Sequence, residues 1–144
     1  MTAVVEPVLD LAAAERARLL NQSRATLLRS GRVVDVALFA GAKGKSVDAA
    51  RKWLSRQRTD GRLVYVVHAG NAYLPLFQFD EAFDLDPAVS ELVSFLVAHD
   101  MSDWAVWSWF DSPSAWLGRR TPADVVAAGD LSTVWRAAKG LFQE

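Results

Sequence analysis

Apolar residues recur at helical spacing through the N-terminal stretch of this chain. Between Val8 and Arg29 they form a rough stripe while arginines occupy other faces, so the pattern predicts one long helix. Residues 1–7 are expected to lie outside it, and Gly31 follows it as a C-cap. Two roles for this helix stay open: it pairs with a second copy of the chain, or it packs on its own domain.

A short apolar helix, a turn and a basic amphipathic helix follow between residues 34 and 58. The pattern predicts the first helix over Val34–Ala40 and a turn over Gly41–Lys45, after which Ser46 caps the second helix. The apolar face of that second helix consists of Val47, Ala50, Trp53 and Leu54. Basic residues occupy most of its remaining surface, which is typical of a helix-turn-helix.

A β-hairpin is predicted directly after the basic helix. Leu63–Val67 has the composition of a strand, His68–Asn71 is a turn, and Ala72–Leu76 forms the returning strand. A hairpin in this place is the wing of a winged helix-turn-helix, and the order of elements resembles the excisionase or MerR type. We therefore expect residues 1–79 to form an N-terminal helix and a winged helix-turn-helix domain that binds DNA.

Residues 80–144 are predicted to form a second, helical domain. An acidic linker, Asp80–Asp86, precedes a helix over Pro87–His99. The next helix is predicted over Asp103–Phe110, with Ser102 or the following aspartate as its N-cap.

Two more helices complete this domain. Thr121 is a helix N-cap, with Pro122 at the first helical position. The last helix is predicted over Leu131–Lys139, and Gly140 is its C-cap because glycine adopts a positive φ at no steric cost. The whole chain is thus predicted to be mainly α-helical, with one small β-hairpin.

The C-terminal third carries a series of turn and packing residues. They are Trp107–Phe110, Ser112-Pro113-Ser114, Leu117-Gly118, Arg120–Asp124, Ala128-Gly129-Asp130 and Val134. This series resembles the toxin-binding domain of the Xre/MbcA/ParS antitoxin family, the antitoxin half of RES-type toxin–antitoxin pairs. One position departs from the family pattern: a second glycine often follows Leu-Gly, and Arg119 stands there in this chain.

The resemblance implies that the protein is an antitoxin. In that family the C-terminal domain docks on a RES-type toxin that degrades NAD, the tail covers the toxin's active site, and the pair represses its own promoter. The candidate partner-binding residues here are Trp109, Arg119, Arg120, Leu141, Phe142, Gln143 and Glu144. For Phe142 the alternative is packing against Trp135. For the whole protein the alternative is a stand-alone DNA-binding regulator that uses its C-terminal domain for self-association or another protein partner.

Tryptophan spacing supports an exposed partner surface. Trp107 and Trp109 are two positions apart and therefore point about 200° apart on a helix. At least one of Trp104, Trp107 and Trp109 is expected to stay accessible, and an accessible tryptophan indicates a partner.

Charge is distributed unevenly, although the net charge is only -1. Seven basic and two acidic residues lie between Lys43 and Arg62, whereas Leu63–Gly118 contains no Lys or Arg. The basic block favours contact with DNA phosphates; the alternative is that both blocks are ordinary solvated surface. The candidate DNA-binding residues are Lys43, Lys45, Ser46, Arg51, Lys52, Ser55, Arg56 and Arg58. Because one recognition helix reads few base pairs, we expect a homodimer on operator DNA, with Val8–Arg29 as its interface.

Catalytic and metal-binding chemistry is not predicted. His68 and His99 are isolated in different domains and the chain has no cysteine, so no metal site is expected. The run Gly41–Ser46 has two residues between its glycines, where a phosphate-binding loop has four. We therefore expect no cofactor and no enzymatic activity. No signal peptide and no apolar run long enough for a membrane span is apparent, so a cytoplasmic location is expected.

Overall fold

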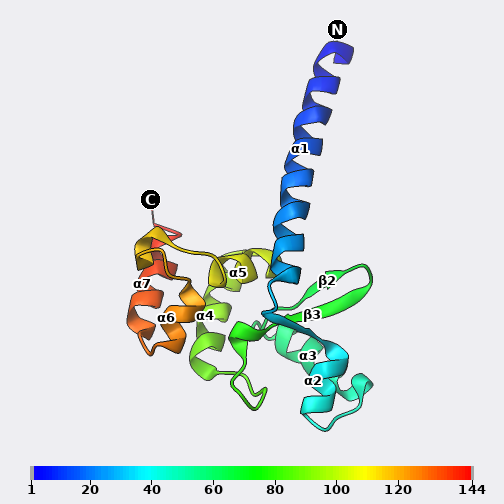
Figure 1. Cartoon of the computed structure of the whole chain (residues 1–144). Coiled ribbons are helices and arrows are strands. Elements are labelled where there is room, and N and C mark those ends of the chain that lie inside the picture. The colour runs from blue at the N-terminus through cyan, green and yellow to red at the C-terminus, as the bar shows by residue number, and fades with distance from the viewer. Residues whose placement is uncertain (1, 144) are drawn as a thin grey trace. The chain divides into compact units, whose positions relative to one another are not determined.

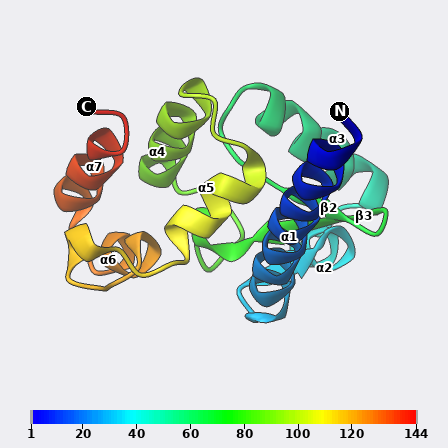
Figure 2. The same ribbon diagram turned by 90° about the horizontal axis from the view of Figure 1, so that it is seen from above.

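The computed structural model describes residues 2–143, and the chain falls into two compact units (Figure 1 and Figure 2). The first unit ends at Gly31 and contains helix α1 (Thr2–Arg29). The second unit begins at Arg32 and contains every other element of the described chain.

The predicted N-terminal helix is confirmed, but it is longer than predicted. Helix α1 begins at Thr2, so the expectation that residues 1–7 lie outside the helix is wrong for residues 2–7. Pro7 removes one backbone donor from the helix but does not end it. Neither α1 nor any other helix in the described part of the chain is long and apolar enough to cross a membrane.

The second unit opens with the predicted winged helix-turn-helix. Strand β1 (Val33–Asp35) leads into α2 (Val36–Ala42), which a turn connects to α3 (Val47–Thr59). The hairpin of β2 (Val66–His68) and β3 (Asn71–Pro75) follows. Strand β3 lies between the other two in a three-stranded antiparallel sheet. The fold is therefore mainly helical with one small sheet, as predicted.

The start of this unit corrects one prediction. The pattern predicts a helix over Val34–Ala40, whereas Val34 and Asp35 belong to β1, and Val34 lies opposite Leu74 of β3. The strand ends at Asp35 because its carboxylate caps α2, accepting a 2.8 Å hydrogen bond from the N–H of Leu38.

The predicted hairpin is confirmed, with a shorter first strand. Leu63 and Val64 are buried outside the sheet, so the strand starts three residues later than predicted, at Val66. The turn consists of Ala69 and Gly70, both at positive φ (50° and 81°), as in two-residue turns that match the twist of a hairpin.

The C-terminal part consists of the predicted helices joined by short turns. They are α4 (Pro87–Ala98), α5 (Asp103–Phe110), α6 (Pro122–Ala127) and α7 (Leu131–Gly140), with 3-10 turns η1 (Leu76–Gln78) and η2 (Ala115–Leu117). The predicted caps are confirmed. The hydroxyl of Ser102 accepts a hydrogen bond from Ala105 at 3.2 Å, and that of Thr121 accepts one from Asp124 at 3.1 Å.

Gly140 does not have its predicted role. It is the last residue of α7, and the C-cap is Leu141 at a right-handed φ of -61°. The N–H of Leu141 donates to the carbonyl of Ala138 at 3.2 Å, so the helical path continues and needs no positive φ.

Two hydrophobic clusters form the core of the second unit. One joins α4–α7 and includes Val64, Leu92, Leu96, Phe110 and Val134. The other joins α2, α3 and the sheet.

The predicted acidic linker packs partly on the helix-turn-helix. Phe83 and Leu85 contact the cluster around α2 and α3, and Phe79 forms a β-bridge with Leu85. These two apolar side chains alternate with acids that stay exposed, so the acidic segment packs on the helix-turn-helix through one side. The predicted domain boundary after residue 79 stays a prediction.

The loop between η2 and α6 contains a strained residue. Gly118 has φ of 63° and Arg119 has φ of 68°, so two successive residues adopt the left-handed conformation. That conformation costs a residue with a Cβ about 1 kcal/mol. The position where the family pattern has a second glycine is thus one that favours glycine.

We expect Arg119→Gly to raise the free energy of unfolding by about 0.5–1 kcal/mol, because the strain at this position disappears. The matched control is Arg119→Ala, which removes the same charge and keeps the Cβ. Urea unfolding followed by tryptophan fluorescence measures both variants. An equal gain in the alanine variant would show that charge, rather than backbone conformation, is responsible.

Candidate functional site

Helix α3 presents a polar, basic face on the side opposite its buried residues. Ala50 and Leu54 face the core, with 0% and 2% of their surface exposed. The side chains of Arg51, Lys52, Ser55 and Arg56 are all exposed. Spacings of one and four place them along one surface of the helix. The structure thus brings together four of the candidate DNA-binding residues.

This basic face continues towards the wing. Arg51 lines a cavity of about 210 Å³ together with Asn71 and Tyr73 of β3. The wing itself has no Lys or Arg, and its tip carries exposed His68 and Val67. Arg51 is therefore a cation that α3 places beside the hairpin.

Two further basic residues remain at the surface of the helix-turn-helix. Lys45 lies over the ring of Trp53 with its ammonium 5.5 Å from the centroid. Lys52 pairs with Asp48 one turn away at 3.2 Å, and both side chains are largely exposed. An exposed pair of this kind contributes at most about 1 kcal/mol and leaves the lysine free to exchange partners.

Three candidate DNA-binding residues have structural partners within the protein. Ser46 caps α3, accepting a hydrogen bond from Ala49 at 3.1 Å. Lys43 pairs with the carboxylate of Asp84 and donates to the carbonyl of Ala82 at 3.4 Å. It thereby holds the packed segment after β3 against the turn before α3.

Arg58 ties the end of α3 to the start of α5. Its Nε donates to Asp103 at 2.6 Å, and its guanidinium lies 5.0 Å from the ring centroid of Tyr65. The hydrogen bond to Asp103 raises the pKa of Arg58, so this group remains charged. The same carboxylate accepts a bond from the N–H of Tyr65 at 3.2 Å. Arg58 therefore joins two helices and is engaged within the protein.

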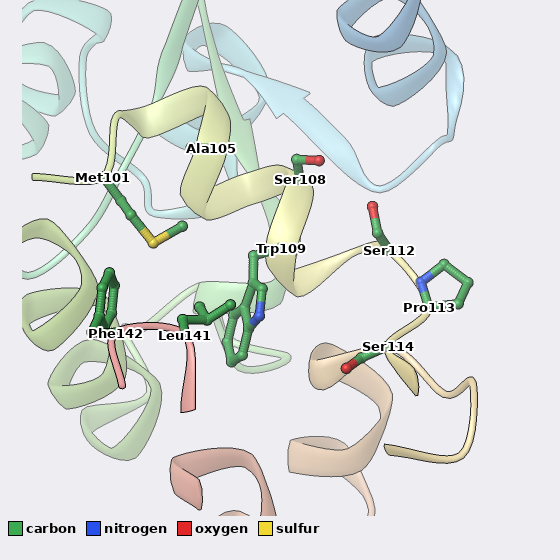
Figure 3. Close-up of a pocket in the computed structure, with 9 residues that line it drawn as sticks. All are labelled: Met101, Ala105, Ser108, Trp109, Ser112, Pro113, Ser114, Leu141 and Phe142. Carbon is green, nitrogen blue, oxygen red and sulfur yellow. The ribbon is translucent and has the colours of Figure 1, made fainter. Parts of the chain in front are cut away.

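A second concave surface lies between α5 and the C-terminal tail. Figure 3 shows the side chains of Met101, Trp109, Leu141 and Phe142 turned towards one another around it. Ala105, Ser108, Ser112, Pro113 and Ser114 complete the lining. The volume is about 540 Å³. We call this surface the α5 groove.

The tail reaches the α5 groove through a ring stack. Phe142 stacks on His99 with centroids 4.2 Å apart and meets the edge of Phe95 at 5.8 Å. Nδ1 of His99 lies 2.8 Å from the carbonyl of Phe95, which holds the imidazole in place. Phe142 thus contacts His99 and Phe95 rather than packing directly on Trp135. The ring of Trp135 contacts Phe95 as well.

The candidate partner-binding residues are only partly brought together. Trp109, Leu141 and Phe142 line the α5 groove. Arg119 and Arg120 are exposed in the loop after η2 and are not among the lining residues. Gln143 is exposed, and Glu144 lies outside the described residues.

The tryptophans divide into buried and accessible ones. Trp107 is buried and donates its indole N–H to Asp111 at 2.7 Å, while Trp104 and Trp109 are half-buried, as helical geometry predicts. Burial raises the pKa of Asp111, and the hydrogen bond from Trp107 acts in the opposite direction. Trp116 is 72% exposed, which the sequence pattern did not indicate.

Sequence reasoning missed two contacts of polar side chains that hold the segments around the wing in place. The buried Gln78 bonds to the backbone of Val64, and the hydroxyl of Ser94 donates to the carbonyl of Gly61 at 2.6 Å. Both contacts link residues far apart in sequence, so no local pattern reveals them. Within residues 2–143 no group of three or more His, Asp or Glu side chains could hold a metal ion.

Comparison with known proteins gives one finding about the fold. No family model matches the chain, and no curated protein matches it. Among solved structures, the chain is similar to the NMR structure of Rv2175c, with a TM-score of 0.62 and 21% sequence identity. The similarity covers 77% of this chain and 81% of that chain. At this identity it shows a shared fold.

Proposed function

We propose that this protein binds double-stranded DNA through α3 and the β2–β3 wing. The observation that carries the proposal is the exposed row of Arg51, Lys52, Ser55 and Arg56 on the helix that precedes the wing. A helix with this surface suits the major groove, where arginines bond to phosphates and to guanine edges. The engaged Lys43 and Arg58 are left out of the proposed interface.

The lack of basic residues between positions 63 and 118 favours approach of DNA from the side of the helix-turn-helix. Residues 63–118 lack Lys and Arg, so the surface of α4 and α5 repels a polyanion. DNA is therefore expected to meet the helix-turn-helix face alone. Because the interface of one copy is small, we propose that a homodimer binds two half-sites of operator DNA and regulates transcription.

Salt dependence tests the electrostatic part of this proposal. If Lys45, Arg51, Lys52 and Arg56 of one copy each neutralise one phosphate, the plot of log affinity against log salt has a slope of about -3.6. Fluorescence anisotropy with a labelled duplex from the gene's own upstream region measures it. The proposed homodimer carries two such copies, so the expected slope is about -7, and a slope near zero would contradict the proposed phosphate contacts.

A more specific proposal concerns the C-terminal helices. We propose that the α5 groove and the tail bind a protein partner, and that the partner is a RES-type toxin that this protein inhibits. The groove, apolar and bordered by Trp109, Leu141 and Phe142, favours a protein ligand. The toxin itself is proposed from the motif residues between Trp107 and Val134.

Deleting residues 141–144 is expected to leave folding and DNA binding nearly intact and to release NAD degradation by the paired toxin. Phe142 is still 36% exposed, so its loss costs far less than removal of a fully buried phenylalanine, which costs about 3–5 kcal/mol. NAD consumption by purified toxin, with and without each protein, measures the effect. Full inhibition by the truncated protein would rule out the tail as the inhibitory element. If no toxin pairs with this protein, the stand-alone regulator is the remaining proposal.

A further inference from the structure

The loop around η2 displays a tryptophan that the helices of its own unit do not cover. Trp116 is 72% exposed, whereas its neighbour Leu117 is 3% exposed and belongs to the cluster of α4–α7. Trp116 is not among the residues that line the α5 groove. An exposed tryptophan leaves a large apolar area in water, and such areas mark sites of contact with partners. The loop therefore carries a second candidate surface, separate from the groove.

Hydrogen bonds at its base hold this loop in shape. The N–H of Ser114 donates to the carbonyl of Arg120 at 3.0 Å, and the N–H of Arg119 donates to the carbonyl of Ser114 at 2.8 Å. The ring of Trp116 lies against the end of α7, where a Cβ at Gly140 would stand 3.9 Å from it. The indole is thus positioned by both the loop and α7, and a partner that binds it loses little free energy in ordering the site.

Arg119 stands beside the tryptophan at a cost in backbone strain. Its φ is 68°, a conformation that is unfavourable for a residue with a Cβ. Its side chain is exposed, and within residues 2–143 it forms no ion pair. The guanidinium therefore gives the fold nothing that offsets the strain. Strain that persists without a structural benefit points to a role in function.

Helix α7 adds a second cation next to the ring. Arg136 lies one turn before Gly140, on the face of α7 that the ring touches. Its side chain is exposed and has no ion pair in the part of the chain that the structure describes. The helix dipole favours Lys139 in the last turn, but it does not account for a cation one turn earlier. The acid of this helix, its N-cap Asp130, lies at the opposite end.

We propose that Trp116, Arg119 and Arg136, which we call the Trp116 surface, bind an acidic peptide segment of a partner protein. An apolar side chain of the segment covers the indole, and its carboxylates pair with the two guanidinium groups. A second copy of the same surface does not fit, because it would place cations against cations. A long polyanion is disfavoured as well, because residues 63–118 of the same unit carry acids and no Lys or Arg.

Peptide display tests this proposal in the absence of both operator DNA and toxin, so its result is independent of the proposed function. The immobilised full chain is presented with a random peptide library. The enriched peptides are expected to combine Asp or Glu with an apolar residue and to lose binding to the Trp116→Ala protein. No enrichment of acidic peptides, or equal binding to the alanine variant, would overturn the proposal.

Anisotropy of one enriched, labelled peptide separates recognition from folding. Trp116→Ala is expected to weaken binding at least about tenfold, and Arg119→Gly about threefold. The glycine variant is informative because the same change relieves backbone strain, so weaker binding cannot come from partial unfolding. The control is Arg51→Glu with Arg56→Glu on α3, which changes the net charge more and is expected to bind the peptide unchanged. Unchanged binding by Arg119→Gly would overturn the role of its guanidinium.

Two measurements address the alternatives. The chain has no cysteine, so Ala115→Cys places a single thiol at an exposed position beside the tryptophan, and rapid reaction with a maleimide is expected. Slow reaction would show that another part of the chain or a second copy covers the loop, which would overturn the free surface. Single-stranded nucleic acid also stacks on tryptophan. Binding of labelled oligothymidine that depends on Trp116, without enrichment of acidic peptides, would replace the peptide with a nucleic acid.

Discussion

Gln78→Ala is expected to lower the free energy of unfolding by about 3 kcal/mol. The side chain of Gln78 is 0% exposed. Its Oε1 accepts from the N–H of Val64 at 2.8 Å, and its Nε2 donates to the carbonyls of Val64 and Pro75 at 2.7 and 3.2 Å. Alanine would leave the buried N–H and C=O of Val64 without these partners, and each unsatisfied group costs about 1–3 kcal/mol.

The side-chain amide of Gln78 pairs with the backbone N–H and C=O of Val64, as a neighbouring strand would. Val64 belongs to the cluster of α4–α7, whereas Gln78 follows β3 in the turn η1. The three hydrogen bonds therefore join the segment before β2 to the end of β3 and the turn η1. Their loss is expected to loosen this junction as well as to lower stability.

Urea unfolding followed by tryptophan fluorescence measures the change. Gln22→Ala is the matched control, because Gln22 is an exposed glutamine on α1, and a surface substitution of this kind changes stability by less than about 0.5 kcal/mol. A loss below about 1 kcal/mol for Gln78→Ala would show that water or a shifted backbone satisfies Val64.

Local signals predicted most of the fold. The caps Ser46, Ser102 and Thr121 lie where the sequence places them, because a cap is recognised from its own side chain and the next three residues. The winged helix-turn-helix follows from the order of its elements, and the basic face of α3 follows from helical periodicity.

Contacts between distant residues could not be predicted in the same way. Lys43 and Arg58 have the charge of DNA-binding residues, but Asp84 and Asp103, more than forty positions away, engage them. Strand β1 has two β-branched residues, Val33 and Val34, but a run this short cannot be told from the apolar helix that follows it, so the pairing with β3 decides the strand. The charge pattern therefore predicted a basic surface on the helix-turn-helix. Which of its cations have no partner in the fold could not be predicted from charge alone.

Arg51→Glu with Arg56→Glu is expected to weaken DNA binding by at least about 100-fold. Both side chains are exposed on the proposed DNA-binding face of α3. A hydrogen bond to a charged group is worth about 1.5–3 kcal/mol, so the loss of two corresponds to about 10²–10⁴ in affinity, before the added repulsion from phosphates. Because neither residue is buried, the stability of the fold is expected to change little.

The control for this variant carries the same change in net charge elsewhere. Arg136→Glu with Lys139→Glu alters two exposed cations of α7, and neither lies in the proposed interface. Its affinity for DNA is expected to fall by less than about threefold at 0.15 M salt, where the Debye length is about 8 Å. Comparable losses in both double variants would indicate a response to net charge alone.

The most direct test of DNA binding by α3 is one anisotropy titration of the upstream duplex with the native chain and these two double variants, at a single salt concentration. We predict measurable binding by the native chain and by the α7 variant, and loss of binding by the α3 variant with its helix content unchanged. Unchanged binding by the α3 variant would contradict the assignment of this helix as the DNA-binding element.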